Sequence, residues 1–180
     1  MTDLVEHQRM MMAAIKDRPV ATNLEAIHQL RRSRELAMLR ETMLWWRELG
    51  ISRCCPFTTA VLNRRGDFQI AVAAFVRETK GSSLLIEQAS LFLEFVSTDS
   101  DPLVAAVANT EHALIQAKGS DEYEARITWF HEPGAVFDFL LHGTPFDEGA
   151  IKGRFVFRIE CEVPGGMDWG EEGSEAFETY

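Results

Sequence analysis

The spacing of apolar residues changes at Gly119, and this change predicts a chain built in two different ways. Before Gly119, apolar residues recur every three or four positions, which is the spacing of helices that bury one face. Beyond it, apolar and polar residues alternate over Glu122–His131 and again over Arg154–Val163, as in half-buried strands. The pattern therefore predicts an α+β fold, with an N-terminal helical bundle followed by a small, antiparallel C-terminal sheet.

Capping residues mark where the helices of the first part begin and end. Thr22 and Glu25 have the spacing of a capping box, and Gly50 is a natural stop for the long helix that follows them. Asp101 followed by Pro102 is a typical helix start. We expect a compact bundle of five or six helices, over Leu4–Lys16, Thr22–Gly50, Pro56–Asn63, a helix capped by Asp67, a helix that starts at Ser82 or Ser83, and Asp101–Gly119.

Two strands and a short helix are expected after Gly119. Each strand has an apolar face and a polar face: Tyr123, Ala125, Ile127 and Trp129 oppose Glu122, Glu124, Arg126 and Thr128, and Phe155, Phe157, Ile159, Cys161 and Val163 oppose Arg154, Arg158, Glu160 and Glu162. The helix spans Gly134–Leu141, and a short third strand is considered near Ile151. The chain then divides into a helical bundle (1–119), a small β-rich region (120–165) and an acidic tail (166–180), which is disordered or ordered only by a partner.

Charge is unevenly distributed along the chain, and this bears on the kind of partner. The formal net charge is −10; residues 1–66 carry 11 basic and 7 acidic side chains, whereas residues 67–180 carry 7 and 21. A nucleic-acid-binding protein concentrates positive charge on its working face, so a nucleic-acid partner is disfavoured. The arginines of Arg31–Arg65 could bind an acidic partner, although a solvated helix face is the simpler interpretation.

Other features of the sequence point to the cytoplasm. The longest apolar stretches, such as Met10–Ile15 and Leu103–Ala108, are far too short to span a membrane, so no membrane partner is expected. The three cysteines lack the spacing of a zinc or redox site and suit a reducing compartment. We therefore expect a cytoplasmic protein.

No pattern of catalytic or cofactor-binding residues is present in the sequence. The five histidines and three cysteines lack metal-ligand spacing, and there is no phosphate-binding loop or nucleophile motif. Asp138 and His142 could share a helix face but are weak ligand candidates, and His131 is expected to lie on the surface. We predict that the chain is not an enzyme, with no catalytic residue, no metal and no cofactor of its own.

The long helix before Gly50 is apolar almost all round, and it contains Trp45 and Trp46. Such a pattern is typical of a helix buried on several sides. Tryptophan is also enriched at binding hot spots, so an interface role is the alternative. Both interpretations of this pair remain open at this point.

Several helical stretches resemble the helical module of a family of DNA-binding proteins encoded beside multinuclear iron oxygenases. Pro56–Leu62 followed by Asp67–Phe75 is similar to the proline-aromatic helix of that module and to the helix after it. Ser82–Leu84 with Phe92–Val96, and then Thr110–Ala113, resemble its later helices. The resemblance covers roughly residues 54–118 and rests mostly on apolar helix spacing.

The region after Gly119 is more similar to the shorter partner proteins of ribosomal-peptide pathways, of the methanobactin (MbnC) type, with a relative in 3-thiaglutamate biosynthesis. The resemblance implies a helical body with a small sheet that pairs, as a heterodimer, with a multinuclear non-haem iron oxygenase. It implies that the leader region of a precursor peptide binds as an added strand. It also implies that the iron, and the oxidation of peptide cysteine, belong to the partner enzyme.

An incomplete sheet offers an edge on which such a strand could add. We predict peptide binding at Glu124, Arg126, Ile127, Thr128, Trp129, Phe155 and Phe157, with Glu122–His131 as the preferred receiving edge and Arg154–Val163 as the alternative. The apolar surface and the resemblance together place the partner interface at Trp45, Trp46, Phe92 and Phe95. The alternatives are a sheet closed by a hidden strand, a DNA-binding or regulatory helical module, and a pure scaffold for an enzyme.

Overall fold

The computed structural model describes residues 4–20, 25–79, 82–120, 122–147, 153–163 and 166–176, which form eight helices and three strands. In chain order these are α1 (Leu4–Ile15), α2 (Glu25–Arg32), α3 (Arg34–Cys54), α4 (Pro56–Arg65), α5 (Phe68–Glu78), α6 (Leu85–Val96), α7 (Pro102–Lys118), β1 (Tyr123–Trp129), α8 (Pro133–His142), β2 (Gly153–Val163) and β3 (Gly166–Ala176). The predicted α+β fold, with a mostly helical N-terminal part and a small antiparallel sheet, is confirmed.

The prediction of a single helix over Thr22–Gly50 is wrong in two respects. The helix is interrupted at Ser33, and its second part does not end at Gly50. Helices α2 and α3 are separate, because Ser33 is an N-cap whose hydroxyl accepts a hydrogen bond from the Leu36 amide at 3.1 Å. Helix α3 also continues past Gly50 to Cys54. Gly50 is buried, and a Cβ atom there would lie 3.0 Å from Leu85 Cδ2, so the glycine lets α6 begin close to α3. The expected cap at Thr22 lies outside the described residues.

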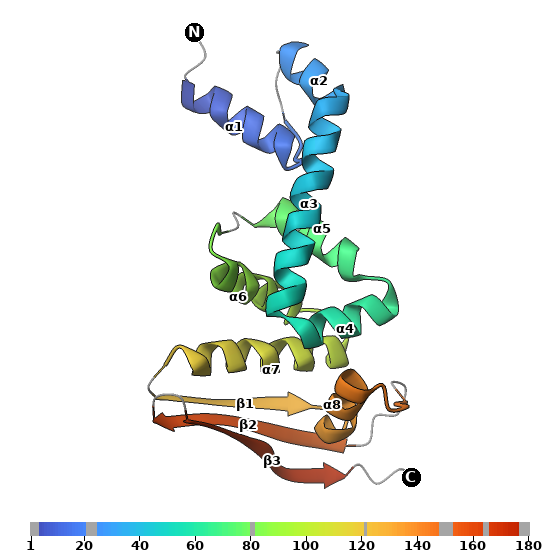
Figure 1. Cartoon of the computed structure of the whole chain (residues 1–180), viewed down its shortest axis with the longest axis vertical. Helices are drawn as coiled ribbons and strands as arrows, with labels where there is room; N and C mark the ends of the chain where they lie inside the picture. Colours follow the sequence, from blue (N-terminus) through green and yellow to red (C-terminus); the bar gives the residue numbers. More distant parts are fainter. Residues whose placement is uncertain are drawn as a thin grey trace.

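Helices α1, α2 and the first half of α3 form an N-terminal arm that projects from the rest of the molecule (Figure 1). The rest of α3 packs with α4 to α7 as a helical bundle, so the arm is the part that departs from the compact arrangement that was predicted. The Arg40 guanidinium of α3 donates hydrogen bonds to the carbonyls of Ala14 and Ile15 at the end of α1. Lys16 Nζ donates to the Thr79 carbonyl at 2.8 Å, which ties the arm to the end of α5.

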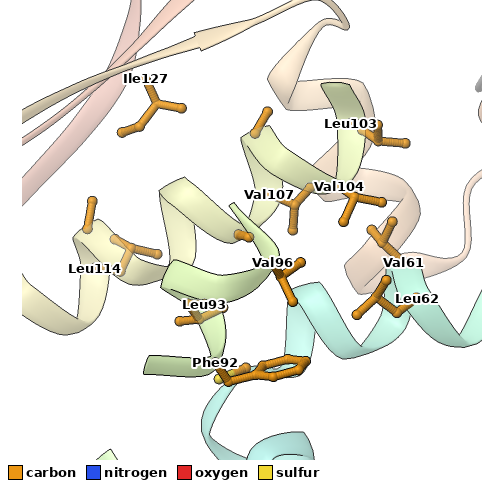
Figure 2. Close-up of a cluster of buried hydrophobic side chains, with 14 of the residues drawn as sticks. Val61, Leu62, Phe92, Leu93, Val96, Leu103, Val104, Val107, Leu114 and Ile127 are labelled. Carbon is orange, nitrogen blue, oxygen red and sulfur yellow. The ribbon is translucent and has the colours of Figure 1, made fainter. Parts of the chain in front are cut away.

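Helix α7 has a central position in the fold, with α4 and α6 on one side and the sheet on the other (Figure 1). Ten of its 17 residues are buried, which is expected for a helix packed on both sides. Figure 2 shows the shared core, in which side chains of α4, α6, α7 and β1 meet: Val61, Leu62, Phe92, Leu93, Val96, Leu103, Val104, Val107, Leu114 and Ile127. The sheet and the helical body are thus built on the same helix.

The start of α7 is fixed by Asp101, as the sequence predicts. Its carboxylate accepts hydrogen bonds from the amides of Leu103 and Val104 at 2.8 and 3.1 Å, and it pairs with Arg65 of α4 at 2.6 Å. Burial by itself raises the pKa of Asp101, but the Arg65 hydrogen bond and the two amides outweigh burial and lower that pKa. This carboxylate therefore joins the ends of α4 and α7.

The sheet is antiparallel throughout, with the strand order β1-β2-β3 and β2 at its centre. The prediction of a disordered or partner-ordered tail is wrong for Gly166–Ala176, because this segment pairs with β2 as β3. The last part of the proposed tail, residues 177–180, and the third strand considered near Ile151 lie outside the described residues. The β-rich region thus continues beyond residue 165.

Candidate functional site

Strand β1 is an outer strand of the sheet. Its register with β2 runs from Tyr123 opposite Cys161 to Trp129 opposite Phe155. Strand β3 adds to the far side of β2, and no strand within the described residues pairs with the other side of β1. The third strand therefore does not close the sheet at β1, and the backbone groups on that side of β1 form a sheet edge.

The apolar face of the sheet packs against α7 and α8. Trp129 is completely buried, and its indole N–H donates to the Thr110 hydroxyl of α7 at 3.2 Å. Its ring lies 5.5 Å from that of Phe137 in α8 and 6.3 Å from that of Phe157 in β2, measured between centroids. Aromatic rings at these separations and tilts pack favourably. This cluster holds the sheet on the helical body.

Four of the residues predicted to bind peptide are core residues in the structure. All four are buried, and none exposes more than 9% of its surface to solvent: Ile127, Trp129, Phe155 and Phe157. They lie on the face that α7 and α8 cover, so they cannot line pockets for the side chains of a bound peptide. This part of the predicted site is wrong, because the sequence shows which residues share a face but not which helices cover it.

The polar face of the sheet is open, and it brings the other predicted residues together. Glu124, Arg126 and Thr128 of β1 are all exposed. The carboxylate of Glu124 lies 3.3 Å from Arg126 Nε and 3.4 Å from Arg158 Nε, while Arg158 pairs with Glu160 at 2.6 Å. Arg158 and Glu160 were missing from the predicted site, although their alternation along β2 places them on this face.

The register sets like charges opposite one another on this face. Arg126 is directly opposite Arg158, and Glu124 is directly opposite Glu160. Like charges in directly opposed positions repel, and the ion pairs of these side chains run along the strands and diagonally between them. The four side chains form a charged cluster, called here the β1–β2 charge cluster, whose outer half belongs to the edge strand.

A groove of about 660 Å³ lies beside the first residue of β1. Its lining includes Ile86 and Leu91 of α6, Ile115 of α7 and Tyr123 of β1, with the carboxylate of Glu87 beside them. Tyr123 thus belongs to both the groove and the edge strand.

The residues predicted for a partner interface lie in two different environments. Trp45 and Trp46 of α3 are 55% and 60% exposed, and their rings meet edge to face with centroids 4.8 Å apart. Phe92 is completely buried against Phe75, which excludes it from an interface and makes that prediction wrong. Phe95 is half-buried and also packs against Phe75. The tryptophan pair is therefore the exposed part of the predicted interface.

The exposed apolar surface of α3 extends beyond the two tryptophans. Met38 and Leu39, about two turns earlier on the same helix, are 57% and 46% exposed. The apolar pattern of this helix alone is typical of a core helix, so this exposure could not be read from the sequence. Clustered exposed apolar side chains are unusual on a monomer and mark interaction surfaces.

The described residues contain no group of three or more His, Cys, Asp or Glu side chains placed to hold a metal ion. Asp138 and His142 do share a face of α8, with 3.6 Å between His142 Nδ1 and a carboxylate oxygen of Asp138, and both are exposed. His131 is buried and lies against the ring of Phe146, so its predicted surface position is wrong. Among the helices of the described part of the chain, none has the length and apolar character to cross a bilayer.

Comparison of the chain with known protein families, with curated proteins and with solved structures finds no significant match. The function proposed below therefore draws on the geometry of the sheet edge, on the exposed tryptophans and on the resemblance described from the sequence.

Proposed function

We propose that this chain is a non-catalytic, cytoplasmic partner subunit that binds the leader region of a ribosomally made precursor peptide along β1. It presents that peptide to an iron-dependent oxygenase, with which it forms a heterodimer and which modifies a cysteine of the peptide. Iron belongs to the oxygenase and not to this chain. The observation that carries the proposal is the open edge of β1, a strand held in place by the helical body.

The physics of strand addition fits this edge. A peptide that pairs with an outer strand gains main-chain hydrogen bonds, which supply affinity with little dependence on sequence. The buried side chains of Ile127 and Trp129 fix β1 against α7, so the edge is ordered before the peptide arrives. Preorganisation of this kind removes an entropic cost of binding from the protein side.

Proline substitutions in β1 test the edge directly. Consecutive amides of a strand point to opposite sides, so one of the amides of residues 125 and 126 faces β2 and the other faces the open edge. Ala125→Pro removes the amide hydrogen of residue 125 and Arg126→Pro removes that of residue 126, because proline has no amide hydrogen. The variant that loses the edge-facing amide is expected to bind peptide at least about tenfold more weakly, since one lost ladder bond and its clash cost about 1.4 kcal/mol or more. The other variant is expected to lose stability.

The measurement is calorimetric titration with synthetic peptides that span the N-terminal parts of short open reading frames found near this gene. Denaturation followed by circular dichroism identifies which proline variant keeps the stability of the unmodified protein. Arg126→Ala is the matched control for Arg126→Pro, because it removes the same side chain but keeps the amide and so separates the two contributions to binding. Unchanged affinity in both proline variants would show that β1 is not the receiving edge.

The second part of the proposal places the oxygenase on the exposed tryptophans of α3. Replacing both Trp45 and Trp46 with alanine is expected to weaken the heterodimer by at least 2 kcal/mol, or about thirtyfold, because buried tryptophans are frequent hot spots. Such a heterodimer is expected to bury about 1,600 Å² in total. Coexpression followed by size-exclusion chromatography and metal analysis of each fraction measures both the complex and the location of the iron.

Leu141→Ala is the control for this experiment, since Leu141 is equally exposed but belongs to α8, a different helix, which lies beside the sheet (Figure 1). A tryptophan double variant that coelutes with the oxygenase as well as the unmodified chain does would contradict the assignment of this interface. Stoichiometric iron in the chain purified alone would contradict the assignment of the metal.

A further inference from the structure

We propose that Glu124 and Arg126 determine which peptide binds, by selecting a strand that carries an acidic residue followed two positions later by a basic residue and that runs antiparallel to β1. This inference rests on the proposed function and adds to it a charge pattern for the peptide. It makes Glu124 and Arg126 specificity-determining residues of the edge.

The first step in the argument is the position of the two side chains. Glu124 and Arg126 are two residues apart on the outer strand, they point to the open face, and their side chains are 53% and 57% exposed. Residues directly opposite each other on adjacent strands bring their Cβ atoms to about 5 Å. Any strand that adds to β1 therefore places one side chain beside Glu124 and another beside Arg126.

The second step is the electrostatic state of the β1–β2 charge cluster. Across the ladder, Arg126 faces Arg158 and Glu124 faces Glu160, so β2 places a like charge directly opposite each of them. The favourable pairs of Glu124 run along β1 to Arg126 and diagonally to Arg158. An added strand could place a carboxylate opposite Arg126 and a cation opposite Glu124. These directly opposed charges would attract, whereas the directly opposed charges of β2 repel.

The third step is the direction of the bound strand. In an antiparallel strand, the residue opposite Arg126 comes before the residue opposite Glu124, so the peptide reads acid, any residue, base. In a parallel strand the order is reversed. All pairs in this sheet are antiparallel, and antiparallel pairing is slightly more stable per residue. The acid-first order is therefore the one that the edge selects.

The experiment uses a displayed library of random twelve-residue peptides, selected against the whole chain and against the variant that carries both Glu124→Arg and Arg126→Glu. The exchange of the two charges places an arginine opposite Glu160 and a glutamate opposite Arg158. Since these direct pairs are attractive, the variant is expected to fold at least as well as the unmodified chain. Denaturation followed by circular dichroism checks this.

Peptides selected by the unmodified chain are expected to show the acid-first pattern, and those selected by the variant the base-first pattern. Two synthetic peptides of the same composition, which differ only in the order of acid and base, then give four dissociation constants by fluorescence anisotropy. Each exposed ion pair is expected to raise affinity about two- to fivefold. Two such pairs predict that the unmodified chain binds the acid-first peptide roughly tenfold more tightly than the base-first peptide, and that the variant has the opposite preference. The preference is expected to shrink at about 1 M salt, where the screening length falls to about 3 Å.

The outcomes separate this inference from the proposed function. Binders that show no charge order but are lost when a proline removes the edge-facing amide of β1 would support strand addition and overturn the charge rule. A base-first preference in the unmodified chain would overturn the antiparallel direction. A library without binders, together with a leader peptide indifferent to proline in β1, would overturn both proposals.

Discussion

Replacing Trp129 with alanine is expected to lower the free energy of unfolding by about 3 to 5 kcal/mol, the range for removal of a large buried aromatic side chain. Trp129 is fully buried where β1 meets α7 and α8, and it contacts the rings of Phe137 and Phe157. The alanine variant would leave a cavity that these rings cannot fill without moving the sheet. Chemical denaturation monitored by far-ultraviolet circular dichroism measures the change.

Trp129→Phe is the matched control for this prediction. Phenylalanine keeps most of the apolar contact but cannot donate the hydrogen bond to Thr110, so we expect a loss of about 1 to 2 kcal/mol. A change below 1 kcal/mol in the alanine variant would contradict the position of Trp129 in the core. Peptide affinity measured on the same two variants shows how much binding falls when the protein is destabilised. That loss can then be compared with the loss caused by a change at the edge of β1.

Replacing Glu111 with alanine is expected to lower the free energy of unfolding by about 3 kcal/mol. The buried carboxylate of Glu111, on α7, accepts hydrogen bonds from the amides of Phe57 and Thr58 at 3.0 and 2.9 Å. It caps the start of α4 from another helix, because Cys55 at the N-cap position makes no side-chain cap. In the alanine variant both amides lose their acceptor, and each such loss costs about 1 to 3 kcal/mol.

Two controls accompany this prediction. Glu94→Ala removes an exposed carboxylate from α6 and is expected to change stability by less than about 0.5 kcal/mol.

Burial raises the pKa of Glu111 in the folded protein, against the hydrogen bonds from Thr58 and Phe57 that lower it. The folded chain therefore holds this proton more tightly, so the contribution of Glu111 to stability falls as the pH rises above about 4.3. Glu111→Gln is expected to remove this pH dependence.

The sequence predicted the helices well where local signals determine them. Pro56 and Gly66 bound α4, and Asp101 begins α7, because capping chemistry acts over a few residues. The break at Ser33 was missed because apolar residues continue at helical spacing across it. The projection of the N-terminal arm depends on contacts such as that between Lys16 and Thr79, which join residues far apart in the chain.

Strand β3 was missed because its composition opposes the structure that it adopts. Gly166–Ala176 is rich in glycine and glutamate, which are both depleted in strands, and it lacks the alternation of β1 and β2. Its place in the sheet comes from backbone pairing with β2. Composition reports the tendency of a segment in isolation and cannot report a partner strand elsewhere in the chain.

The sequence predicted which residues of the candidate site share a face of a strand. It did not predict which of the two faces the helices bury and which they leave exposed. Alternation placed Ile127 with Trp129, and Glu124 with Arg126, and the burial pattern confirms both pairs. The covering of the first pair by α7 and α8 is a tertiary property. The directly opposed like charges of the β1–β2 charge cluster depend on register, which two strands that are distant in sequence do not reveal.

The central position of α7 has a consequence for the order in which the chain folds during its synthesis. The helices that cover one side of α7 precede it in the chain, whereas β1 and β2, which cover the other side, follow it. At roughly 5 to 20 residues per second, the ribosome needs several seconds to add the residues between the end of α7 and the end of β2. During that interval the nascent chain holds a finished helical body with one apolar flank exposed, and aggregation competes with folding until β2 arrives.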